Sequence, residues 1–108
     1  MEIKPLITID VVSSIDIRIG EVVSCEKMPK KDRLLVMSVN TGVDTRTIVT
    51  NIGSQYKPED LIGKRMPFIL NLPPHTFGSV TSNGMIMCIT NGDKIELITS
   101  DAEIGSKL

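Results

Sequence analysis

Apolar and β-branched residues occur along the chain in short segments separated by turn-forming residues, which predicts strands rather than long helices. The expected strands cover residues 17–27, 34–41, 45–52, 66–72, 85–90 and 94–98. Pro29 ends the first strand, and Asn91-Gly92 between apolar runs indicates a hairpin at the last pair. Leu34-Leu35-Val36-Met37 is apolar on both faces, which a closed barrel with a covered outer face requires.

Two short helical segments accompany these strands. Thr8 to Ser14 begins with good N-cap residues, although β-branched residues within it weaken the helix prediction. Between the third and fourth strands, Pro58 suits the first turn of a helix and Gly63 suits its end. A helix between strands three and four is the order found in the oligonucleotide-binding (OB) barrel. The pattern therefore predicts an all-β barrel with short helices.

Length and composition indicate one ordinary globular domain covering residues 1–108. The chain has 41 % apolar and 23 % charged residues, a net charge of −1 and a pI near 5.8. A general nucleic-acid binder is usually basic, so any nucleic acid bound here would be recognised through few phosphates and by shape. No apolar run reaches membrane-spanning length and no secretory signal is visible, so we expect a cytoplasmic protein without membrane insertion.

The residues that carry enzyme chemistry are missing or scattered. No phosphate-binding glycine motif occurs, and no serine lies in a nucleophile-elbow pattern. Cys25 and Cys88 lie in apolar segments and are expected to be small buried side chains, while His75 is the only histidine. We therefore expect no catalysis, no cofactor and no metal site.

A cluster of cations marks the turn between the first two strands. Lys27, Lys30, Lys31 and Arg33 are opposed only by Glu26 and Asp32. The cluster is either a solvated turn or a phosphate contact, for which the guanidinium of Arg33 is well suited. Elsewhere, Arg18 beside Asp16 favours an ion pair, and Asn51 would either bond a base edge or close a turn.

Four blocks together resemble the free-standing tRNA-binding domain family. They are Asp16 to Val22, Pro29 to Leu34, Tyr56 to Lys64, and Asn71 to Met85. The family includes small dimeric structure-specific tRNA-binding proteins, the C-terminal appendage of methionyl-tRNA synthetases and the export chaperone CsaA. The resemblance covers the chain from about residue 12 to the end. It implies an OB barrel whose terminal extensions form a homodimer that binds tRNA.

The resemblance also implies a set of contact residues. Lys31-Asp32-Arg33-Leu34 stands where the family has a motif facing tRNA, so Lys30, Lys31 and Arg33 are expected to hold phosphates. Asn51, Ser82 and Met85 match family positions near the nucleic-acid surface, although strand entry and a core Met are equally good roles for the last two. Thr76 and Gly78 replace the usual Lys and Arg, which leaves His75 as the one possible cation of that loop. Phe77 is expected to pack under the loop rather than stack on a base.

Two other functions stay open. Pro73-Pro74, six methionines and the missing loop cations favour a CsaA-like chaperone that binds unfolded client peptides in an apolar groove. The third possibility is an appendage that docks on an aminoacyl-tRNA synthetase and delivers tRNA.

Overall fold

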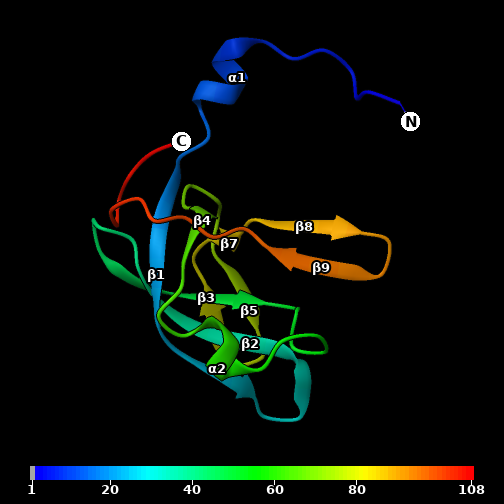
Figure 1. Ribbon diagram of the computed structural model, residues 1–108, viewed down its shortest axis with the longest axis vertical. Helices are drawn as coiled ribbons and strands as arrows, with labels where there is room; N and C mark the ends of the chain where they lie inside the picture. The colour runs from blue at the N-terminus through cyan, green and yellow to red at the C-terminus, as the bar shows by residue number, and fades with distance from the viewer. Residues whose placement is uncertain (1) are drawn as a thin grey trace.

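The main sheet contains five antiparallel strands in the order β3-β2-β1-β4-β7 in the computed structural model, which describes residues 2–108. Two further hairpins, β5–β6 and β8–β9, extend from it (Figure 1). The strands are β1 (Ile17–Met28), β2 (Lys31–Asn40), β3 (Thr45–Thr50), β4 (Arg65–Ile69), β5 (His75–Phe77), β6 (Val80–Ser82), β7 (Met85–Ile86), β8 (Cys88–Asn91) and β9 (Lys94–Leu97).

Hydrogen bonds from the β6–β7 connection to β3 close the sheet into a barrel. The Asn83 amide donates to the Thr47 carbonyl at 2.9 Å, and the Val49 amide donates to Ser82 Oγ at 2.9 Å. The short helix α2 (Pro58–Leu61) lies between β3 and β4 in the chain, as the sequence predicted. The all-β, OB-type barrel is therefore confirmed.

Both predicted helices are present, α1 with its predicted N-cap and α2 with Pro58 in its first turn. In α1 (Ile9–Ser13) the Thr8 hydroxyl accepts a hydrogen bond from the Val11 amide at 3.4 Å. Before α2, Asp60 Oδ2 accepts a hydrogen bond from the Lys57 amide at 2.8 Å. Gly63 follows that helix with φ +84°, which is the left-handed stop that glycine favours.

Three strand predictions were wrong in detail. β2 begins at Lys31 rather than Leu34, because a tight two-residue turn lets Lys31 pair with Met28. The predicted loop before Met85 contains the β5–β6 hairpin. The predicted strand 85–90 divides into β7 and β8, because β7 pairs with β4 in the barrel while β8 leaves it to pair with β9.

Gly20 lies where neighbouring strands pack closely on β1. The register of β1 against β2 shifts later, between Val22 and Ser24. A Cβ on Gly20 would lie 2.7 Å from Val39 Cγ1 and 3.0 Å from Phe68 Cδ2. The side chains of neighbouring strands therefore fill the space over Gly20.

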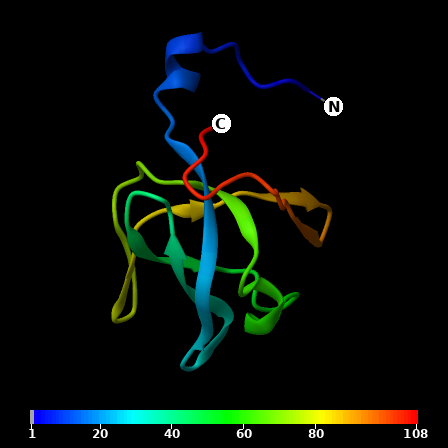
Figure 2. The ribbon, with the colours of Figure 1, turned by 60° about the vertical axis from the view of Figure 1, so that its left-hand side comes forward.

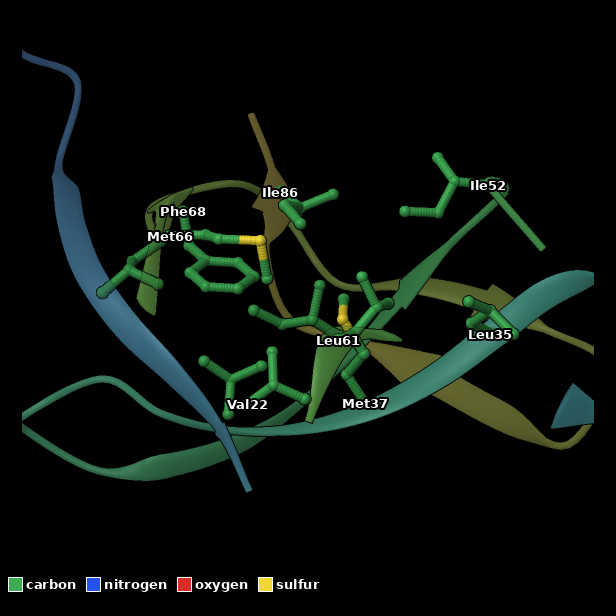
Figure 3. Packing of buried hydrophobic residues seen from close by; sticks show 11 residues of the cluster. Val22, Leu35, Met37, Ile52, Leu61, Met66, Phe68 and Ile86 are labelled. Atoms are coloured by element: carbon green, nitrogen blue, oxygen red, sulfur yellow. The ribbon is translucent and has the colours of Figure 1, made fainter. Parts of the chain in front are cut away.

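The core fills the inside of this barrel (Figure 3). Phe68 is fully buried together with Leu35, Met37 and Met66. Leu61 from α2 is equally buried, so this short helix covers one end of the barrel. The core brings together residues that are far apart in the sequence and holds the strand ends in place.

The two termini behave differently. Residues 2–15 extend away from the barrel, and α1 buries none of its residues (Figures 1 and 2). The last residues instead lie along β1, where the Gly105 amide donates to the Ile19 carbonyl at 2.7 Å. Within residues 2–108, both helices are too short to cross a membrane.

Candidate nucleic-acid interface

The β1–β2 turn presents three cations to solvent. Lys30 is the one non-glycine residue with a positive φ, +64°, among residues 2–108. Lys30, Lys31 and Arg33 are all exposed. The ion pairs formed within residues 2–108 are Arg18–Asp16, Arg46–Asp44, Arg65–Glu21 and Lys94–Glu96. Because none of them includes the turn cations, all three are available to an anion.

The cationic turn forms one wall of a depression of about 600 Å³. Asn51 and Phe77 line the same depression. The Asn51 side chain makes no hydrogen bond to any other residue of the described part, 2–108, so its donors and acceptor are free. The structure therefore brings the predicted phosphate contacts beside the predicted base contact.

A close backbone approach holds these two parts together. The Gly53 amide donates to the Arg33 carbonyl at 2.9 Å. A Cβ on Gly53 would lie only 2.3 Å from the Asp32 carbonyl oxygen, so only glycine allows this contact. The sequence reasoning missed Gly53, although a glycine directly after a predicted strand was a detectable signal.

An apolar groove of about 470 Å³ lies beside the cationic depression. Asn51 and Phe77 line both, so the two are adjacent. Met85 also lines the groove and is 48 % exposed. This exposure excludes the role of a core methionine and puts the Met85 side chain where a ligand can reach it.

Ser82 is buried beneath this groove. It is 3 % exposed, and its hydroxyl accepts from the Val49 amide at 2.9 Å and donates to the Gly84 carbonyl at 3.3 Å. The hydroxyl is thus occupied in holding β6 against β3. Its predicted RNA contact stays a prediction, and the geometry gives Ser82 the role of positioning Met85.

His75 lies at the start of β5 and packs on Phe77. The two rings are edge to face with centroids 4.6 Å apart. His75 lines neither the depression nor the groove, so the structure does not group it with the other predicted contacts. Phe77 is partly buried but still borders both spaces, which combines the packing and contact roles.

Arg18 and Arg46 make contacts within the fold. Arg18 Nε lies 3.0 Å from Asp16 Oδ1, which confirms the predicted ion pair. Arg46, for which no role was predicted, donates to Asp44 and also to the carbonyls of Leu70 and Asn83 at 3.0 and 3.1 Å. The Arg46 hydrogen bond, followed by that of Thr41, lowers the pKa of Asp44. Through its bond to the Asn83 carbonyl, Arg46 also stabilises the position of the segment that leads to Met85.

Both cysteines are half-buried, free and packed against the core. Burial raises the pKa of the Cys25 thiol to about 11, with smaller contributions from Glu26 and Glu59. Burial also raises the pKa of Cys88, which lines the groove. Both thiols are therefore protonated at neutral pH and poorly nucleophilic. In the part of the chain that the structure describes, no cluster of His, Cys, Asp and Glu could hold a metal ion.

Residues 17–107 match a family model described as "Putative tRNA binding domain". The chain is 44 % identical over 101 residues to a methionine–tRNA ligase of Flavobacterium johnsoniae, spanning 93 % of this chain but 14 % of that protein. A solved structure of a MetRS-related protein from Pyrococcus horikoshii has a TM-score of 0.93 and 32 % identity, with 97 % of this chain and 99 % of that one covered.

A second solved structure, the CsaA chaperone from Picrophilus torridus, has a TM-score of 0.87 and 25 % identity, with 95 % of this chain and 99 % of that one covered. The family match includes nearly all of the barrel and the C-terminal segment along β1. The chain therefore belongs to the tRNA-binding domain family.

Proposed function

We propose that this protein binds tRNA, without catalysis and without a cofactor, and recognises it by shape as a homodimer in the cytoplasm. The observation that carries the proposal is that the cationic depression and the apolar groove lie side by side. Asn51 lines both, and Met85 lines the groove. Lys30, Lys31 and Arg33 hold phosphates, while Asn51 and Met85 line the contact surface. The net charge of −1 limits the number of phosphates, so shape supplies the selectivity.

The exposed N-terminal arm supports the homodimer. Ile3 and Leu6 are 94 % and 98 % exposed, and Ile7 and Ile9 are largely exposed as well. Covering an apolar segment of this kind with a second surface is favourable, because it removes apolar area from water. A twofold dimer would cover both arms at once and put two cationic turns on one particle. Sedimentation equilibrium tests this: a monomer at micromolar concentration would contradict the dimer.

Charge reversal at the turn tests the site. Lys31→Glu with Arg33→Glu should weaken binding of bulk tRNA and flatten its dependence on salt, since each lost phosphate contact lowers the slope of log K against log salt by about 0.9. The matched control is Lys64→Glu with Lys107→Glu, which changes the net charge equally at exposed lysines outside the depression and the groove. Equal losses in both double variants would show a general charge effect and contradict this site.

A CsaA-like chaperone is the second candidate, and the apolar groove is the observation that favours it. A structural neighbour is a CsaA chaperone, and Met85 offers an adaptable apolar contact to a peptide. Protection of an aggregating client protein, undiminished by saturating tRNA, would support this function. Absence of protection at excess protein would exclude it.

A synthetase is the third proposed partner. The curated relatives are methionine–tRNA ligases, of which this chain spans about one seventh. A chain that delivers tRNA would dock on such an enzyme. Co-purification with an aminoacyl-tRNA synthetase would support the docking, and a pull-down that contains none would count against it.

A further inference from the structure

We infer that the apolar groove receives one unpaired nucleotide of the bound RNA, whose base enters beside Met85 while its flanking phosphates lie on the β1–β2 turn. This inference rests on the proposed tRNA function and adds a base-recognition site to it. The ligand of the groove is then an unstacked nucleotide rather than the surface of a duplex.

The size and lining of the groove suit a base. Its volume of about 470 Å³ lies in the range of roughly 300–1,000 Å³ that is typical of small-ligand sites. Ile52, Ile69 and Ile86 supply apolar walls, and Met85 and Met87 supply polarisable thioethers. Thioether sulfurs make favourable contacts with aromatic rings. A planar aromatic base therefore gains contacts here that a hydrated surface would not give.

A polar group lies at the border of the groove, where a base edge needs one. The Asn51 amide has no hydrogen-bond partner within residues 2–108, and Asn51 lines both the groove and the cationic depression. An amide offers a donor and an acceptor side by side, which matches the edge of a base. Phe77 also borders both spaces and offers a ring for stacking.

The charges beside the groove select a nucleotide over an apolar peptide. Among residues 2–108, Lys30, Lys31 and Arg33 form no ion pair, and Asp32 is the one acidic residue that lines that depression. A nucleotide has a phosphate one link away from its base, so it matches an apolar groove that opens on a cationic wall. An apolar peptide would leave these cations without a partner.

Methionine methyl NMR tests the inference with the full chain. Protein labelled with ¹³C at the methionine methyls is titrated with bulk deacylated tRNA and, in parallel, with a blunt fully paired RNA duplex. We expect tRNA to shift the Met85 and Met87 methyls upfield through the ring current of a base. The buried methyls of Met37 and Met66 should stay in place and report an intact core. The duplex should leave all of them unshifted.

Two substitutions test the apolar contacts without removing a cation, and of the two only Met85 lies outside the cationic depression. Met85→Ala should reduce tRNA affinity roughly two- to tenfold, as expected for a lost thioether–aromatic contact. Phe77→Leu should reduce it roughly fivefold or more, as expected for lost stacking. Both should leave the salt slope unchanged. Ile89→Ala is the control, since Ile89 is 46 % exposed, similar to Met85, but does not line the groove.

The possible failures are distinguishable. If tRNA binds through the turn while the Met85 and Met87 methyls stay unshifted and Met85→Ala binds normally, the groove inference is overturned and the proposed function stands. If tRNA does not bind at all, both fail. If an apolar peptide shifts these methyls and tRNA does not displace it, the groove belongs to peptides and the inference is overturned.

Discussion

Ser82→Ala tests whether the serine beneath the groove is a structural residue or an RNA contact. The Ser82 hydroxyl is the only hydrogen-bond acceptor shown for the Val49 amide within residues 2–108, and both residues are buried. Alanine fills nearly the same volume and adds no new contact. The substitution therefore removes one acceptor and leaves a buried N–H group without a partner.

The expected loss of folding stability follows from the unsatisfied Val49 amide. Leaving a buried donor unsatisfied costs about 1–3 kcal/mol, because the amide loses its water on folding and gains nothing in return. The unfolding entropy expected of a 108-residue chain converts this cost into a Tm that is lower by about 4–13 °C. Loss of the bond to the Gly84 carbonyl adds less, because at 3.3 Å it is longer and weaker than the bond from the Val49 amide.

Thermal unfolding followed by circular dichroism, at one fixed protein concentration, measures this change. Thr81→Ala is the matched control, since Thr81 is the exposed neighbour and, within the described residues 2–108, its hydroxyl shares a hydrogen bond only with that of Thr76. It should shift the Tm by no more than about 2 °C, as surface substitutions generally do. If Ser82→Ala has the same Tm as Thr81→Ala but a lower affinity for tRNA, Ser82 is a direct RNA contact and its structural role is refuted.

Three further predictions concern the turn, the Arg46 contacts and the cysteines. Lys30→Gly should leave the Tm unchanged or raise it, because glycine accepts φ +64° without strain, and should lower the salt slope of tRNA binding by about 1; a lower Tm would contradict the first part. The lowered pKa of Asp44 stabilises the fold above the ordinary value of 3.8, and this stabilisation is lost as the pH falls through the folded-state pKa. Asp44→Asn should therefore flatten the acid limb of a stability–pH curve, and an unchanged limb would oppose this. Cys25, whose pKa is about 11, should react with iodoacetamide at pH 7.5 far more slowly in the folded protein than in urea. Equal rates would show that the Cys25 thiol is accessible in the folded protein.

Local signals in the sequence were sufficient for the architecture. Turn residues and apolar segments located the strands of the main sheet, N-cap residues located the first helix, and Pro58 with Gly63 located the second. The β5–β6 hairpin escaped prediction because Thr76 and Thr81 pair through a short polar segment without apolar alternation. The break between β7 and β8 also escaped, since an apolar run does not reveal that its two ends pair with different partners.

The site was predictable in its charged part only. A cation cluster at a turn is visible in any sequence, and the structure places Lys30, Lys31 and Arg33 together as expected. The burial of Ser82 and the exposure of Met85 depend on how β6 and β7 reach β3, which is long-range information. The role of Gly53 likewise depends on a backbone contact with Asp32, twenty-one residues earlier.

Titration of labelled bulk tRNA with the purified protein, at low and at physiological salt, tests the central claim most directly. Single-stranded RNA of equal length serves as competitor. Salt-sensitive binding that the competitor displaces only weakly is the predicted result, because a flexible single strand must lose conformational entropy before its phosphates reach both turns of a dimer, whereas tRNA presents them at a fixed spacing. No binding at low salt, or complete displacement by an equal amount of single strand, would contradict recognition of tRNA by shape.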